Sequence, residues 1–143
     1  MPSPWPRAAF GFFAGAISVL TFHQGMWAIL HGLGEMPPPF PVVRMPPLGV
    51  PLTLDLCFWG GVWAAAFGLV LPKLPRGVPM WLLGLGLAAA LVSLFLVAPL
   101  KGQPIAGGFA VMAFVRSFLI NGSWGIGGGL IMPLLLPRLV QSA

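Results

Sequence analysis

The chain has 143 residues, of which 58% are hydrophobic and 6% are charged, and its formal net charge is +5. A soluble domain carries about 25% charged residues, so seven basic and two acidic side chains are too few to cover a water-exposed surface. The basic residues stand at segment ends rather than in a stripe, which excludes a nucleic-acid-binding surface. Composition therefore predicts one all-α domain, residues 1–143, integral to a lipid bilayer.

Four segments are long and apolar enough to cross a bilayer, since one crossing takes about 20 mostly apolar residues in a helix. They cover about residues 8–33, 52–71, 78–98 and 108–136. The fourth segment is too long for one straight crossing, so we expect it to tilt or to begin along the membrane interface. Together the segments predict a bundle of four transmembrane helices.

The positions of the basic residues predict how this bundle is oriented. Cytoplasmic loops of membrane proteins carry an excess of Lys and Arg. With the amino terminus inside, the cytoplasmic side holds Arg7, Lys73, Arg76 and Arg138, and the opposite side holds Arg44 and Lys101, with Arg116 just within the fourth segment. This bias, together with the even number of crossings, predicts that both termini lie in the cytoplasm.

The connections between the segments differ in character. Residues 73–77 (KLPRG) form a tight basic turn, which we expect to make the second and third helices antiparallel neighbours. Residues 36–51 form an extracytoplasmic loop with seven prolines in sixteen residues. Proline fixes φ and lacks an amide donor, so this loop is predicted to form neither helix nor sheet ladder but a stiff polyproline II path. Its apolar residues predict that it covers the outer mouth of the bundle or docks on a partner, although a plain rigid connector explains the same composition.

The first segment contains both histidines and one of the two acids, within residues 21–35 (TFHQGMWAILHGLGE). In the predicted orientation, most ionisable and amide side chains of the segments gather in the outer half of the membrane. Charged groups inside a bilayer are costly and tend to face the bundle interior and to pair. We therefore predict an intramembrane polar cluster, a candidate binding site, made of His23, Gln24, His31, Glu35, Asp55, Arg116 and Asn121.

Within this cluster, we expect an ion pair between Asp55 and Arg116, because it cancels both charges. A contact between His31 and Glu35 along one helix is the second expectation. Simpler explanations exist for each residue. Arg116 is long enough to snorkel to lipid head groups, and His31 and Glu35 fit the membrane interface by their depth. A hydrogen bond to another helix explains His23 at least as well as ligand binding does.

A recurring pattern, G-x-W-x-x-x-x-G-L, predicts how the helices pack. It occurs at residues 25–33, 61–69 and 122–130. Residues seven apart return to nearly the same face of a helix, so each copy offers a glycine-lined groove to another helix, with its tryptophan on a different face. The predicted packing glycines are Gly25, Gly32, Gly61, Gly68, Gly122 and Gly129. The recurrence fits either a two-helix duplication or coincidence in a glycine-rich chain.

The sequence contains no catalytic motif and no complete metal site. His23 and His31 lie about 12 Å apart along one helix and cannot clamp one haem within a protomer, although a single-histidine tetrapyrrole or a haem shared between protomers stays open. His31, Glu35 and Asp55 are one ligand short of a structural zinc site. A quinone pocket would suit His23, Gln24 and nearby tryptophans. We therefore assign no catalytic residue, no metal and no cofactor, and expect the protein not to be an enzyme.

Two short stretches, Phe22–Gly25 (FHQG) and Asn121–Gly125 (NGSWG), carry a resemblance to a known group of proteins. They resemble small four-helix inner-membrane proteins of bacteria, a group that brings no activity with it. The resemblance implies a multi-pass protein of the bacterial inner membrane.

Small size and a stiff apolar loop favour a non-enzymatic accessory or interaction subunit of a membrane assembly. Such a subunit would contact lipid and either a membrane-protein partner or a second copy of itself. The alternative is a binder or carrier of a quinone, haem or ion that uses the polar cluster.

Overall fold

The computed structural model describes residues 4–136, and this part of the chain is helical apart from loops and one small hairpin. Four helical stretches are long and apolar enough to cross a membrane, which confirms the predicted number: Pro4–Gly32, Leu52–Lys73, Pro79–Leu100 and Val111–Leu135. Arg138, one of the basic residues used to predict the orientation, lies outside the described residues.

Two of these stretches contain a π-helical turn. The first stretch runs as α1 (Pro4–Ser18), the π-helical η1 (Val19–His23) and α2 (Gln24–Gly32). The third stretch runs as α4 (Val78–Val92), the π-helical η3 (Ser93–Val97) and α5 (Ala98–Leu100). A single π turn lets a helix continue while it changes which side chains face a neighbour.

The second and fourth stretches contain no such turn. α3 (Leu52–Val70) is followed by a short 3₁₀ turn, η2 (Leu71–Lys73). α6 (Val111–Leu135) is one continuous helix that begins three residues later than predicted. The cause is the preceding turn, η4 (Ile105–Phe109), in which residues 106–108 have positive φ. A right-handed helix cannot run through left-handed residues.

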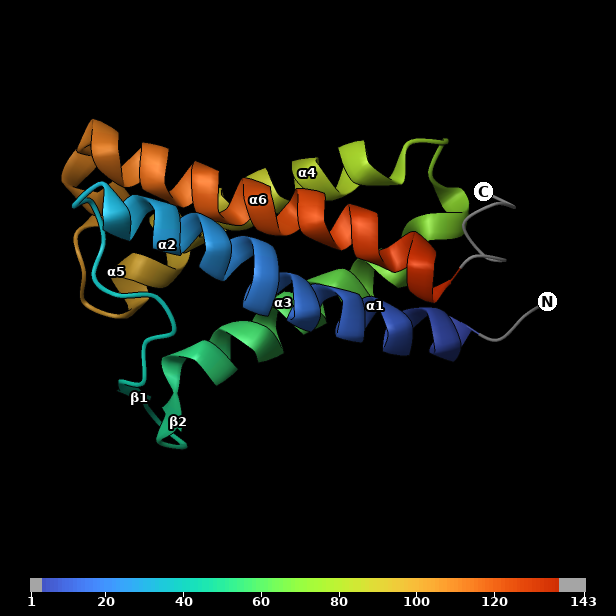
Figure 1. Cartoon of the computed structure of the whole chain (residues 1–143), viewed down its shortest axis with the longest axis horizontal. Helices are drawn as coiled ribbons and strands as arrows, with labels where there is room; N and C mark the ends of the chain where they lie inside the picture. The colour runs from blue at the N-terminus through green and yellow to red at the C-terminus, as the bar shows by residue number, and fades with distance from the viewer. Residues whose placement is uncertain (1–3, 137–143) are drawn as a thin grey trace.

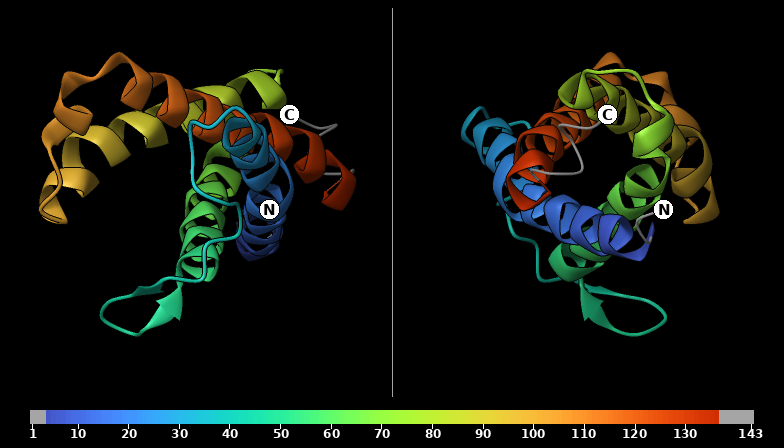
Figure 2. Two further views of the ribbon diagram at one scale, coloured as in Figure 1. Left: turned by 60° about the vertical axis from the view of Figure 1, so that its left-hand side comes forward. Right: turned by 90° about the vertical axis from the view of Figure 1, so that its right-hand side faces the viewer.

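The four stretches form an open bundle. α1 packs along α3 and along α6, and α4 packs along the other side of α6 (Figure 1). α3 and α4 follow each other in the chain, yet they hardly touch, and Figure 2 shows them running apart. The prediction that the turn at 73–77 makes them neighbours is therefore wrong. We call the end of the bundle that carries residues 33–51 and 101–110 the loop end.

Glycines explain why α1 and α3 lie so close together. A Cβ atom added to Gly11 or Gly15 of α1 would collide with the backbone of α3, at the carbonyls of Ala64 and Gly60. From the other helix, an added Cβ at Gly68 would meet the backbone of α1. Small residues let helices approach closely enough to gain backbone-to-backbone contact.

α4 and α6 approach each other in the same way. An added Cβ at Gly125 would meet the Leu82 carbonyl, and one at Gly129 would meet the backbone of Pro79. These two close pairs, α1–α3 and α4–α6, are joined through α1 and α6. They hold α3 and α4 on different sides of the bundle, whatever the length of the turn between them.

The predicted packing glycines of the three repeat copies differ in whether they contact another helix. Four of the six lie against another helix: Gly61, Gly68, Gly122 and Gly129. Gly25 and Gly32 have nothing within 4 Å of an added Cβ. The groove predicted for the first copy therefore receives no helix of this chain.

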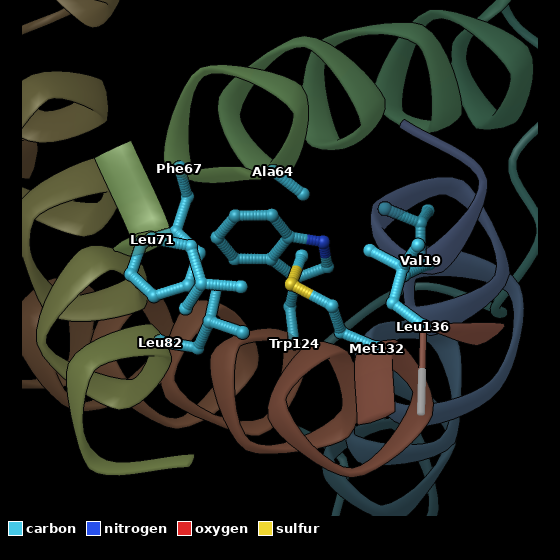
Figure 3. Packing of buried hydrophobic residues seen from close by; sticks show 9 residues of the cluster. Val19, Ala64, Phe67, Leu71, Leu82, Trp124, Met132 and Leu136 are labelled. Carbon is cyan, nitrogen blue, oxygen red and sulfur yellow. The ribbon is translucent and has the colours of Figure 1, made fainter. Parts of the chain in front are cut away.

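The core lies where α1, α3, α4 and α6 meet, and Trp124 is at its centre (Figure 3). Trp124 is 3% exposed. Its Nε1 donates a hydrogen bond to the Gly15 carbonyl at 3.0 Å, and its carbonyl accepts one from Ser18 Oγ at 2.6 Å. As predicted, Trp124 lies on a different face from the glycines of its repeat, since Gly122 and Gly129 face α4 and Trp124 contacts α1. Its neighbours in the core include Val19, Ala64, Phe67, Leu71, Leu82, Met132 and Leu136.

The proline-rich loop (36–51) contains a short antiparallel ladder, contrary to prediction. β1 (Arg44–Met45) pairs with β2 (Val50–Pro51), and this hairpin projects from the bundle at the start of α3 (Figure 1). The Gly49 amide donates to the Met45 carbonyl at 2.8 Å, and the Leu52 amide donates to the Val43 carbonyl at 2.8 Å. A ladder this short tolerates proline because the edge position of a proline needs no amide donor.

Candidate functional site

A cavity of about 200 Å³ lies between α3 and the α4–α5 stretch, where these helices run apart. η1 and α6 form its remaining walls. The cavity is lined mostly by apolar side chains and by three tryptophans. Each of the four stretches contributes one polar lining residue, and the loop that follows α5 contributes a fifth. These residues are His23, Asp55, Ser93, Asn121 and, from the loop, Lys101.

The two long walls each carry a charged residue near the loop end. On α3, Asp55, Trp59 and Trp63 follow at intervals of four and so share one face of the helix, and all three line the cavity. On the opposite wall, Lys101 directly follows α5 and comes one helical turn after the apolar Val97. On each wall the charged residue therefore lies near the loop end, and apolar residues follow it deeper in the bundle.

Both π-helical turns face this cavity. Val19 and His23, the first and last residues of η1, line it, and so do Ser93 and Val97, the first and last residues of η3. π-Helical turns are rare and are found frequently at functional sites. Their convergence from two different stretches marks the cavity as the candidate site.

His23 and Asp55 bring polar groups to the cavity that the described chain leaves unpaired. His23 is 6% exposed, and its Nδ1 is buried without a hydrogen bond. The carboxylate of Asp55 makes neither a hydrogen bond nor an ion pair with any residue from 4 to 136. Buried polar groups are usually hydrogen-bonded, because burial without a partner costs free energy. The pair therefore has unused capacity to bind a ligand.

Asn121 connects the cavity to a second hollow. Its Nδ2 donates to the Ser117 carbonyl at 2.9 Å. The second hollow, of about 490 Å³, lies at the loop end and includes Trp27 and Arg116. Ser93 and Asn121 line both spaces, so the two adjoin at these side chains.

Arg116 lies in the second hollow and does not pair with Asp55. Its Nη1 donates to the Glu35 carbonyl at 2.9 Å, and its Nε donates to the Met112 carbonyl at 3.1 Å. Between residues 4 and 136 the predicted ion pair is absent. Through the Glu35 carbonyl, Arg116 joins α6 to the chain three residues beyond the end of α2.

Gln24 is buried next to His23 but does not line the cavity. Its Oε1 accepts a hydrogen bond from the Phe40 amide at 2.7 Å. Gln24 therefore anchors the proline-rich loop to the first helical stretch. The quinone pocket predicted from His23 and Gln24 together loses one of its two named residues.

His31 and Glu35 lie at the loop end, outside the cavity. His31 is exposed, and its Nδ1 lies 2.9 Å from the Met36 carbonyl. The contact expected between the His31 and Glu35 side chains is not formed in the described part of the chain. The predicted polar cluster thus divides: His23, Asp55 and Asn121 line the cavity, and the other members serve backbone contacts or the surface.

Sequence reasoning missed Ser93, Lys101, Trp59 and Trp63 as members of the site. The four-residue spacing from Asp55 through both tryptophans was a usable signal, since it places them on one helical face. The π turn that begins at Ser93 has no comparable signal in the sequence.

The size and the side chains of the cavity limit what it can hold. Among the residues that the structure describes, no three His, Cys, Asp or Glu side chains are placed to hold a metal ion. Pockets for drug-sized ligands measure about 300–1,000 Å³. A cavity of about 200 Å³ therefore suits a single ring or a lipid head group.

Comparison with known protein families, with curated proteins and with solved structures finds no match to this chain. Function is therefore inferred from the cavity and its lining residues.

Proposed function

We propose that the protein is a multi-pass protein of the bacterial inner membrane that binds a small amphipathic molecule in the cavity between α3 and α4. One observation carries this proposal: two π-helical turns converge on a cavity in which the imidazole of His23 and the carboxylate of Asp55 have no hydrogen-bond or ion-pair partner within residues 4–136. Because α3 and α4 run apart, the molecule would enter sideways from the lipid.

Exposed apolar side chains on all four helical stretches support the membrane location. Large examples include Phe13, Ile29, Leu54, Leu96 and Leu134. Soluble monomers rarely expose contiguous apolar surface beyond a few hundred Å², whereas lipid requires it. Counted along the sequence, four basic residues (Arg7, Lys73, Arg76 and Arg138) fall on the side predicted to be cytoplasmic and three on the other, a small excess that supports cytoplasmic termini.

Cysteine labelling tests this orientation. In a Cys57→Ser background, Leu48→Cys in the hairpin is expected to react with a membrane-impermeant maleimide added from the periplasmic side. Lys73→Cys, in the turn at the other end, is expected to react only after the membrane is opened. The reverse pattern would show that the loop end faces the cytoplasm.

Purification in mild detergent tests the binding proposal. We expect a stoichiometric small molecule to be recovered by solvent extraction and mass spectrometry. His23→Ala should raise the dissociation constant of this molecule by about tenfold, the effect of losing one good hydrogen bond in a dry site, and so lower the amount recovered. His31→Ala is the matched control, because His31 is exposed and lies outside the cavity. No bound molecule, or equal losses in both variants, would contradict the proposal.

A non-enzymatic accessory subunit is the second candidate, and the hairpin favours it. Val42 and Leu48 are 79% and 83% exposed, on a loop that Gln24 holds in place through Phe40. The same purification separates the two candidates. A defined protein partner in stoichiometric amount, present without a small molecule and lost when residues 36–51 are replaced by a Gly/Ser linker, would favour the accessory role.

A further inference from the structure

We infer that the molecule in this cavity is a phospholipid with a zwitterionic head group, in which an ammonium stands next to a phosphate. The inference rests on the function proposed above and names its ligand. It starts from the charges of the cavity: Asp55 and Lys101 line opposite walls near the loop end, and neither forms an ion pair within residues 4–136.

The two charges select among ligand classes. A lone organic cation would complement Asp55 and meet repulsion from Lys101, and a simple anion would do the reverse. A neutral quinone would leave both charges unmatched. A head group with both signs can give each charge a charge-assisted hydrogen bond, which is stronger than a neutral one. A free carboxylate and a free ammonium that do not reach each other leave room for such a group between them.

Polarity along the walls follows the order of groups in a phospholipid. Asp55 is three residues into α3, and Lys101 directly follows α5, so the charges are near the loop end. His23 lies level with the start of α3, because α1 and α3 run antiparallel with Gly11 against Ala64 and Gly15 against Gly60. A neutral imidazole always has one N–H donor, which suits an oxygen of the phosphate or of the ester next to it. Trp63 is two helical turns beyond Asp55 on α3, roughly 12 Å further in, and it suits the first methylenes together with the aliphatic lining.

The opening between α3 and α4 favours a lipid over a free head group. Trp59 lines the cavity and is also 53% exposed, so its indole lies at the open side. Acyl chains would leave through this opening and stay in the bilayer. A volume of about 200 Å³ then needs to hold only the head group and the ester region.

Native mass spectrometry of the delipidated full chain tests the inference. The detergent-solubilised protein is titrated with equal amounts of phosphatidylethanolamine and phosphatidylglycerol of the same acyl chains. We expect one tightly bound lipid and a preference for phosphatidylethanolamine of about tenfold, because its ammonium gives Asp55 an opposite charge as well as hydrogen bonds, whereas the hydroxyls of phosphatidylglycerol give hydrogen bonds alone. This comparison needs no variant. No preference, or a preference for phosphatidylglycerol, would overturn the inference.

Two substitutions give distinct signatures. Asp55→Asn should reduce the preference to about one by weakening only phosphatidylethanolamine, and Asp55→Glu should keep it. Lys101→Gln should weaken both lipids, about tenfold each, because both contain the phosphate. Glu35→Gln and Lys73→Gln are the matched controls, since neither residue lines the cavity. Selectivity that survives Asp55→Asn in a folded protein would also overturn the inference.

A third arm separates the lipid from a soluble head group. O-Phosphoethanolamine is expected to compete at least a hundredfold more weakly than the lipid, and equal competition would reject the lipid as the source of the head group. The proposed function can survive a negative result. If a quinone or another neutral molecule occupies the cavity and is lost with His23→Ala, the head-group inference fails alone. An empty cavity under all conditions would reject both.

Discussion

Replacing Trp124 by alanine is expected to lower the free energy of unfolding by about 3–5 kcal/mol, the usual cost of removing a large aromatic side chain from a core. The indole fills the centre of the core between the four helical stretches. It also joins α6 to α1, because its Nε1 donates to the Gly15 carbonyl and its own carbonyl accepts from Ser18. The protein is unfolded in mild detergent by titration with SDS, and circular dichroism monitors the loss of helix.

Trp59→Ala is the matched control for this prediction. Trp59 is half-exposed and makes no hydrogen bond with the described chain, so its loss from the delipidated protein should cost only about 0.5 kcal/mol. Trp124→Phe should fall between the two, since it keeps a ring and loses the N–H donor. Equal destabilisation by both alanine variants would show that Trp124 does not organise the core.

The number of helical stretches and their approximate limits could be predicted because they depend on local sequence. Length and hydropathy fix where a helix can span a bilayer, and the four stretches agree with this expectation. The start of α6 could not be predicted, because it depends on left-handed backbone at residues 106–108. Ala106 gives no sign in the sequence that it adopts such a conformation.

The packing of the helices was only partly predictable. A spacing of seven selected Gly25 and Gly32, which meet no helix, and omitted Gly11 and Gly15, which do. The better signal was the spacing of four in G-x-x-x-G, present at Gly11 and Gly15. Even that spacing does not name the partner helix. The short turn at residues 73–77 predicted α3 and α4 to be neighbours, and the glycine contacts of each helix with another partner override it.

Three members of the candidate site could be predicted from charge and depth, namely His23, Asp55 and Asn121. The pairing of Asp55 with Arg116 could not, since the actual partners of Arg116 are backbone carbonyls. Sequence patterns show side-chain charge, but they do not show which carbonyls a fold leaves free. The carboxylate that Arg116 leaves unpaired is one of the polar groups that line the cavity.

The cavity exists because α3 and α4 run apart, which the sequence did not reveal. If α3 and α4 were packed as neighbours, Asp55 and Lys101 would face a closed interface. Glycine contacts instead hold α3 on α1 and α4 on α6, so the space between α3 and α4 remains open. A substitution that loosens one of these glycine contacts should therefore affect the whole bundle.

Gly15→Ala is expected to lower the free energy of unfolding by about 3 kcal/mol, at the upper end for overpacking. The added Cβ would meet the Gly60 carbonyl and the Ala64 side chain, both fixed on α3. α1 and α3 would have to separate, and this shift would also stretch the Trp124–Gly15 hydrogen bond. The loss should appear although alanine favours helix over glycine by about 1 kcal/mol.

Gly25→Ala is the control that isolates the contact, because it makes the same chemical change in the same helical stretch. An added Cβ at Gly25 has nothing within 4 Å, so only the helix preference of alanine remains. This variant should be as stable as the original chain or more stable by up to about 1 kcal/mol. The same SDS titration measures both variants. If Gly15→Ala were as stable as Gly25→Ala, backbone contact between α1 and α3 would not be what holds the bundle in its open form.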